Sequence, residues 1–149
     1  MTENRFIVSL DENDLNEVVA IERACYSKPW SVDQFKQELN NPVAFVDGCK
    51  IGNQLTGYIC YWLVAEEMQV LNVAVARACR RRGIGRLLLN HAVHRCVKNG
   101  LSTAWLEVRA GNFSAIALYQ HYGFQVDGVR RGYYNDGEDA LLMFMAFDH

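Results

Sequence analysis

Two side chains in the second half of the sequence have the chemistry and the setting for proton transfer. Glu107 lies between apolar neighbours in an alternating segment, 103–109, that predicts a strand. Loss of solvation there would raise the pKa of its carboxyl group toward the range of a general base, the alternative being an ion pair with Arg109 or another arginine. Tyr119 lies on the apolar face of a helix predicted after Asn112, where its phenol could protonate a leaving group or simply pack in the core. The two residues predict acid–base chemistry if the fold brings them to one cleft.

A segment rich in arginine and glycine could bind an anion. Its sequence is Arg80-Arg81-Arg82-Gly83-Ile84-Gly85. It follows an apolar run over 70–75 that predicts a central strand covered on both faces, and it opens a helix with one apolar stripe. The first N–H groups of such a helix are unpaired, glycine lets a ligand approach them, and arginine adds charge. The segment therefore predicts a ligand with several phosphate groups, the alternative being an arginine-rich surface turn.

The same glycines allow another interpretation, the Gly-x-Gly-x-x-Gly fingerprint of dinucleotide-binding domains. Glu107 follows Gly85 at about the spacing, roughly twenty residues, expected of a ribose-binding acid. However, Leu88 stands where the third glycine belongs, and Glu107 lies in the middle of its strand rather than at the carboxyl end. A His91-x-x-His94 pair lacks further zinc ligands in its neighbourhood, so we predict no metal site.

The elements that must position these residues follow from hydrophobic periodicity and capping signals. Acidic residues at 11–14 can cap a helix over 15–25, and Ser31 with Gln34 fits a capping box for a short second helix. These two helices are expected to form a lid. Strands are predicted over 6–10, 43–46, 55–64, 70–75, 103–109, 124–129 and 140–147, with a glycine-rich turn before 55 and helices after Gly83 and Asn112.

Composition narrows the class of protein. With 149 residues, half of them hydrophobic, the chain fits one domain with a substantial core. A formal net charge of −2 argues against a dedicated nucleic-acid binder, which needs a basic face. The five cysteines form no Cys-x-x-Cys motif, and neither a signal-peptide segment nor a membrane-spanning apolar run is evident. We expect a soluble cytoplasmic protein with reduced thiols.

Taken together and in order, several segments resemble one family over nearly the whole chain. The chain resembles the ribosomal-protein alanine N-acetyltransferases, the RimI type of the GNAT acetyltransferase superfamily. One position departs from the family pattern, because the residue after Ala76 is often proline and here is Arg77. The segments that carry the resemblance are Lys28-Pro-Trp-Ser31, Val73-Ala-Val75, 80–85, Leu106-Glu-Val-Arg109 with Asn112, Ala115-Ile-Ala-Leu-Tyr119, Gly123-Phe124, Arg131-Gly-Tyr-Tyr134 and Asp136-Gly-Glu-Asp-Ala-Leu-Leu-Met143.

The resemblance implies a fold, a co-substrate and roles for residues. It implies one GNAT domain over 1–149 of mixed α/β (α+β) architecture, with a mostly antiparallel sheet of about seven strands, splayed at its middle and flanked by about four helices. Acetyl-CoA would lie in the splay, with no metal. Glu107 would be the general base and Tyr119 the general acid. The residues implied to bind the co-substrate are the backbone of Val73 and Val75, the pyrophosphate loop Arg80, Arg81, Arg82, Gly83, Ile84 and Gly85, and Asn112.

The acceptor follows from the resemblance alone. It would be a protein N-terminal amine, that of the alanine of ribosomal protein S18, acetylated by a monomer or weak dimer. An acidic rim of Glu66, Glu67, Asp136, Glu138 and Asp139 could suit a basic peptide, or these could be ordinary solvated charges. The alternatives are a GNAT enzyme that acetylates a small amine or another protein N-terminus, and a non-catalytic module that binds acyl-CoA or a dinucleotide.

Overall fold

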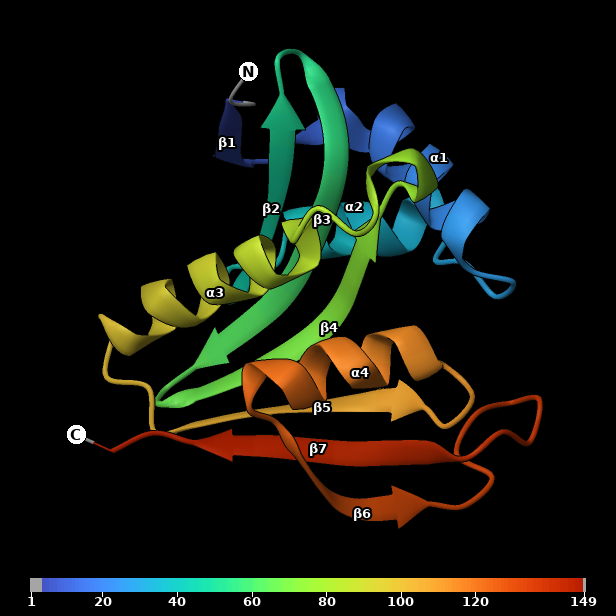
Figure 1. Ribbon diagram of the computed structural model, residues 1–149, viewed down its shortest axis with the longest axis vertical. Helices are drawn as coiled ribbons and strands as arrows, with labels where there is room; N and C mark the ends of the chain where they lie inside the picture. The colour runs from blue at the N-terminus through green and yellow to red at the C-terminus, as the bar shows by residue number, and fades with distance from the viewer. Residues whose placement is uncertain (1–3, 149) are drawn as a thin grey trace.

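A computed structural model describes residues 4–148 and shows a seven-stranded mixed sheet with helices on both faces (Figure 1). The strand order is β1-β2-β3-β4-β5-β7-β6. The strands are β1 (Arg5–Ser9), β2 (Ala44–Ile51), β3 (Gln54–Val64), β4 (Glu67–Val75), β5 (Thr103–Arg109), β6 (Gln125–Arg130) and β7 (Ala140–Ala146). The helices are α1 (Leu15–Cys25), α2 (Val32–Leu39), α3 (Ile84–Val97) and α4 (Phe113–Tyr122), with short 3-10 turns at Glu12–Asp14 and Arg77–Cys79.

The centre of the sheet is splayed. Strands β4 and β5 run parallel and pair only from Glu67↔Thr103 to Val70↔Leu106, after which they diverge toward their carboxyl ends (Figure 1). The other neighbouring strands of the described sheet pair antiparallel. The implied mixed α/β fold with a splayed sheet is thereby confirmed.

The predicted capping signals form as expected. The Ser31 hydroxyl accepts from the N–H of Gln34 at 3.1 Å, and the Gln34 side chain accepts from the N–H of Ser31 at 2.8 Å, which fixes the start of α2. At the start of α4 the Asn112 side chain accepts from the N–H of Ala115 at 3.3 Å. Gly123, with φ +129°, ends α4 in a backbone conformation that L-residues rarely adopt.

Two buried clusters hold the layers together. Apolar residues of α3, α4 and one face of the sheet form the larger cluster, which includes Leu88, Leu106 and Met143. Residues of α1, α2 and the other face form the second, which includes Val18 and Phe35. In Figure 1, α3 and α4 lie in front of the sheet while α1 and α2 lie behind it. The first two helices are therefore packed layers of the fold rather than the lid that the sequence suggested.

The prediction for the second strand was too short. Strand β2 continues to Ile51 through the stretch predicted to be a glycine-rich turn, and only Gly52 and Asn53 separate it from β3. Gly48 is needed inside the strand, because a Cβ there would lie 2.7 Å from Leu55 Cδ1. Asp47 is fully buried and accepts a hydrogen bond from the Tyr61 hydroxyl at 2.7 Å. A glycine and an aspartate thus occupy strand positions because of close packing and a buried partner.

Candidate active site

The splay leaves the carbonyl groups of β4 facing a gap instead of a neighbouring strand. The Tyr26 hydroxyl donates to the carbonyl oxygen of Val73 at 2.5 Å. The Val75 carbonyl oxygen accepts from the Cys25 thiol at 3.4 Å and from Arg80 Nε at 3.3 Å. Alternate residues of a strand point their backbone groups to the same side, so these carbonyls mark an open strand edge at the splay. Both residues had been predicted to hold the co-substrate by their backbone.

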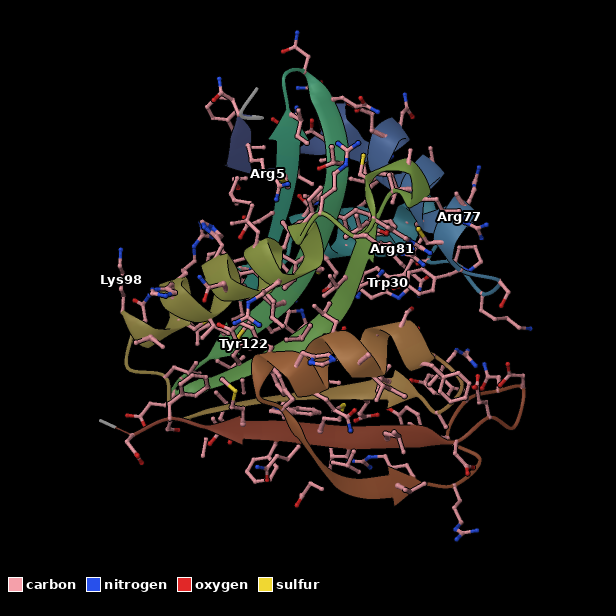
Figure 2. All side chains as sticks on the ribbon, viewed as in Figure 1. Arg5, Trp30, Arg77, Arg81, Lys98 and Tyr122 are labelled. Atoms are coloured by element: carbon pink, nitrogen blue, oxygen red, sulfur yellow. The ribbon has the colours of Figure 1, made fainter. Side chains whose placement is uncertain are left out.

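The arginine–glycine loop joins this open edge to α3. Gly83 caps α3 with φ +75°, and no side chain caps the helix among the described residues. Arg81 also has positive φ, at +64°. Gly85 lies against α4, where a Cβ would approach Leu118 Cδ2 to 3.2 Å. In Figure 2, Arg81 is labelled near the carboxyl end of β4, where the loop leaves the strand. The uncapped N–H groups of α3 are therefore directed at the end of the splay, as an anion site requires.

A cleft of about 590 Å³ runs between this loop and α4. Among the predicted co-substrate residues, Arg82 is absent from its lining, and the carbonyl oxygen of Arg82 instead accepts from Arg5 Nη1 at 2.6 Å. The predicted residues that line the cleft are Val73, Val75, Arg80, Arg81, Gly83, Ile84, Gly85, Asn112 and Tyr119. The structure thus brings together all but one of the predicted co-substrate residues, and places Tyr119 beside them.

A second pocket, of about 340 Å³, adjoins the first from the side of α1 and α2. Its walls are the α1–α2 connection, the carboxyl end of β5 and Tyr134, and it contains Glu107. Glu107 does not line the larger cleft, and the glycines of the loop do not line this pocket. The two cavities share Tyr26, Val73, Arg109, Asn112, Ala115 and Tyr119. Two ligands could therefore meet at Tyr119, one from each side of the sheet.

The two carboxylate oxygens of Glu107 have different surroundings, one near an arginine and the other without a hydrogen-bond partner among the described residues. Its side chain is 13% exposed, and its Oε1 lies 3.6 Å from Arg130 Nε of β6. Oε2 is buried and has no hydrogen-bond partner within residues 4–148. Of the two predicted ion pairs, the one with another arginine is formed, with Arg130, whereas the one with Arg109 is not, since Arg109 pairs with Asp136 and Glu138. A hydrogen bond to Glu107 raises the pKa of Tyr133, so this hydroxyl stays protonated beside the carboxylate.

Tyr119 is buried at the junction of the two cavities. It is 6% exposed, and its ring packs against Phe124 with 5.9 Å between ring centres. Burial, followed by the charges of Tyr26 and Tyr134, raises the pKa of the Tyr119 phenol above its usual value. The hydroxyl is therefore protonated at neutral pH and can donate a proton or a hydrogen bond.

Sequence reasoning missed the group that shapes the second pocket, the one that contains Glu107, which we call the acceptor-side pocket. Arg109 Nη1 donates to both oxygens of Asp136, at 3.1 and 3.0 Å, and to Glu138 Oε1 at 3.0 Å, while its guanidinium carbon lies 3.9 Å from the centre of the Tyr134 ring. Glu138 Oε2 also accepts from the N–H of Gly111 at 2.9 Å. The β6–β7 connection is thereby held against the end of β5. The three acidic residues within 136–139 indicated that a cation could lie nearby, but only the fold shows that Asp136 and Glu138 face Arg109.

The proposed acidic rim is wrong. Asp136 and Glu138 are engaged with Arg109, and Asp139 accepts from the N–H of Gly132 at 2.8 Å. Glu66 and Glu67 lie at the opposite end, because Glu67 pairs with the first residue of β5 whereas Ala140 pairs with its last. Seven strand residues separate the two groups, roughly 20 Å. These carboxylates organise turns and do not form one surface.

Several further findings bear on the class of protein. All five cysteines are free thiols. Across residues 4–148, His, Cys, Asp and Glu side chains nowhere gather in threes at a distance suited to a metal ion. In the same part of the chain, no helix has the length and apolarity needed to cross a membrane.

Comparison with known proteins agrees with this geometry. Residues 15–124 match the acetyltransferase (GNAT) family. The [ribosomal protein bS18]-alanine N-acetyltransferase of Escherichia coli K12 is 36% identical over 140 residues, which cover 92% of this chain and 94% of that protein. The crystal structure of the ribosomal-protein-S18-alanine N-acetyltransferase from Escherichia coli superposes with a TM-score of 0.89 at 34% identity, covering 98% of this chain and 96% of that one.

A more distant structure shows the same fold with a ligand. Arabidopsis thaliana NAA60 in complex with acetyl-CoA superposes with a TM-score of 0.86 at 18% identity, covering 97% of this chain and 100% of that one. The family match and the Escherichia coli relative each cover most of the chain. The chain therefore belongs to the acetyltransferase (GNAT) family, and its resemblance to the ribosomal-protein alanine N-acetyltransferases of that family is confirmed.

Proposed function

We propose that this chain transfers the acetyl group of acetyl-CoA to the N-terminal α-amino group of a protein, namely the N-terminal alanine of ribosomal protein bS18. The observation that carries the proposal is the meeting of two cavities at Tyr119, with Glu107 in one and the arginine–glycine loop in the other. Group transfer needs a donor and an acceptor in contact while remaining separately bound. The relatives named above act on bS18, which supports this acceptor.

The larger cleft fits acetyl-CoA in both charge and shape. The backbone of Gly83 to Gly85 and the Arg80 and Arg81 side chains suit the pyrophosphate. The open edge of β4 at Val73 and Val75 offers carbonyl groups to the amide N–H groups of the pantetheine arm. Asn112, at the start of α4, lines both cavities and can hydrogen-bond the arm. This arrangement directs the thioester toward Tyr119.

The proposed reaction is a direct attack of the amine on the thioester. The neutral amine nitrogen forms a bond to the thioester carbon, and Glu107 Oε2, directly or through a water molecule, accepts the proton that the nitrogen loses. The tetrahedral intermediate then breaks its C–S bond, and the sulfur leaves as a thiolate with Tyr119 as its hydrogen-bond donor and proton source. Because the pKa of Tyr119 is raised above that of a thiol, the tyrosinate takes a proton back from solvent as the thiol leaves, and the Glu107 carboxylic acid releases to solvent the proton that it took from the amine.

An N-terminal amine suits this modest base better than a lysine does. An α-amino group with a pKa near 7.7–8.0 is roughly one-tenth neutral at pH 7, whereas a lysine near 10.4 is neutral about once in a few thousand molecules. A single carboxylate with one oxygen already near Arg130 is therefore sufficient for the first acceptor.

The test is mass spectrometry of a peptide that begins Ala-Arg and carries an internal lysine, incubated with acetyl-CoA and the protein. We expect one acetyl group, located by fragmentation on the N-terminal nitrogen. Acetylation of lysine or of free amines alone would support a small-amine acetyltransferase, and acetyl-CoA binding without transfer would identify a binding module.

Glu107→Gln tests the base. The amide keeps the size of the side chain but cannot take a proton, so we expect kcat to fall by about 100-fold or more while the KM for acetyl-CoA stays within about twofold. Asp14→Asn is a matched control, because it also replaces a carboxylate by an amide but lies at the start of α1, paired with Lys50. Unchanged turnover in Glu107→Gln would remove this residue from the base role.

A further inference from the structure

Part of the sheet carries large apolar side chains that belong to neither core cluster. They lie on the face of β3, β4, β5 and β7 that is opposite to α4, and we call them the apolar sheet face. Val64 is 52% exposed and the other members are partly exposed. The members are Trp62, Val64, Trp105, Leu142 and Phe144.

Strand register shows that these side chains form one surface. Directly paired residues of neighbouring strands project to the same face, and Trp62 pairs with Gln69, Gln69 with Trp105, and Trp105 with Phe144. This row crosses four strands and spans about 14 Å, three interstrand distances of about 4.8 Å. Val64 lies in the next row, opposite Glu67. Leu106 and Val108 alternate to the other face, where they are buried.

The apolar sheet face continues directly into the acceptor-side pocket. Glu107, the proposed base, projects from β5 on the same face as Trp105, two residues further along, and pairs with Leu142 of β7. On the other side, α2 borders both features, because Gln34 lines the pocket and Glu38 accepts from the Trp62 indole N–H at 3.0 and 3.1 Å. The apolar sheet face thus offers a path along which a polypeptide can extend when its first residue occupies the pocket.

The charges around the apolar sheet face select the chemistry of what binds there. Glu67 is exposed at its far end, whereas Glu38 is buried and accepts from the Trp62 indole N–H, so it presents no exposed charge. The arginines at the pocket end already face carboxylates, Arg130 facing Glu107 and Arg109 facing Asp136 and Glu138. The surface is therefore apolar, with the exposed negative charge of Glu67 at its far end, and it complements a basic protein surface that presents apolar or aromatic side chains.

We propose that the apolar sheet face binds the body of the acceptor protein beyond the residues held in the pocket, that body being a basic protein with exposed apolar side chains. The inference rests on the proposed function and extends it, because it places acceptor selection on a surface about 14 Å wide as well as in the pocket. A few residues commonly dominate such contacts, so single substitutions are informative.

The test compares two acceptors of different reach, the whole bS18 protein and the dipeptide amide Ala-Arg. The dipeptide spans at most about 7 Å, so it fills the pocket and little else. Phe144→Gln and Val64→Lys remove apolar surface or add a repelling charge. Phe6→Gln, on edge strand β1 at the other end of the sheet, is the matched control, since Phe6 is 54% exposed. Circular dichroism and Tm establish that each variant is folded.

We expect Phe144→Gln and Val64→Lys to raise the KM for bS18 about tenfold, with the dipeptide KM within about twofold and Phe6→Gln without effect. Equal changes for both acceptors, or none for bS18, would overturn the inference. A wild-type dimer in light scattering that Phe144→Gln dissociates, with the bS18 KM unchanged, would assign the face to a second copy and also overturn it. Failure of the proposed function is distinct, because the wild type would then acetylate neither acceptor.

Discussion

Replacement of Arg109 by methionine tests whether the β6–β7 connection builds the acceptor-side pocket. Methionine retains an unbranched apolar stem but removes the guanidinium that pairs with Asp136 and Glu138 and lies 3.9 Å from the centre of the Tyr134 ring. Tyr134 is a wall of the pocket, so its position depends on this contact. We expect the variant to bind the acceptor poorly while remaining folded.

The size of the effect follows from the exposure of the three charged groups. Arg109 is 30% exposed in both ion pairs and each carboxylate is 34% exposed, so solvent screening limits each pair to about 0.5–1 kcal/mol. The guanidinium–Tyr134 contact adds about 0.5–1 kcal/mol. The connection thus loses about 1.5–3 kcal/mol of local stabilisation. Since 1.4 kcal/mol is a factor of ten in an equilibrium constant, we expect the peptide KM to rise at least about tenfold.

Steady-state kinetics with both substrates checks this expectation. Arg109 also lines the larger cleft, so the KM for acetyl-CoA is expected to change, but by less than about threefold. Lys50→Met is the matched control, because it removes the cation of an ion pair with Asp14 at 3.1 Å that lies away from both cavities. A lowered Tm with an unchanged peptide KM would refute the reasoning, and an equal rise in both KM values would show that Arg109 acts on the cleft as a whole.

Three further predictions concern buried groups. Tyr119→Phe should lower kcat at least about tenfold with little change in the KM for acetyl-CoA, and an unaltered kcat would place the proton donor elsewhere. Glu22 accepts hydrogen bonds from the Tyr58 hydroxyl, the Asn72 side-chain amide and the backbone N–H of Trp30, so the NH₂ group of Glu22→Gln would face donors. We expect Tm to fall by about 3–10 °C and the peptide KM to rise, and an unchanged Tm would contradict this. Burial raises the pKa of Tyr58, Tyr61 and Tyr119, so their protonated forms stabilise the fold fully below about pH 10. Above that pH, each should lower the free energy of unfolding by about 1.4 kcal/mol per pH unit. The chain has seven tyrosines, so tyrosinate absorbance that reaches the value for all seven without loss of circular dichroism would refute the prediction.

The local elements were predictable because short-range chemistry fixes them. The capping box at Ser31, the cap at Asn112 and the alternation of 103–109 each involve residues within a few positions of one another. The strand–loop–helix sequence around Gly83 likewise predicted where α3 starts. In these places, local preference and tertiary structure agree.

The rest depended on contacts between distant segments. Gly48 looks like a turn residue until Leu55 and Leu10 are seen to press against it. The partners of Glu107 and Arg109 were similarly hidden, because every pairing of these residues joins strands or loops more than twenty positions apart. The acidic rim failed for the same reason, since charge patterns along a sequence do not reveal which cations the fold will bring to them.

The splay itself explains why the two cavities are not independent. A buried carbonyl without a donor costs about 1–3 kcal/mol, so a parallel pair that separates after Val70 must satisfy its open edge by other means. The donors to this edge are Tyr26 and Cys25, at the end of α1, and Arg80, in the loop. Tyr26 is also a wall of the acceptor-side pocket. Of these donors, Cys25 and Arg80 line the larger cleft alone, whereas Tyr26 lines both cavities. A ligand that displaces the Tyr26 hydroxyl from this edge therefore acts on both binding sites.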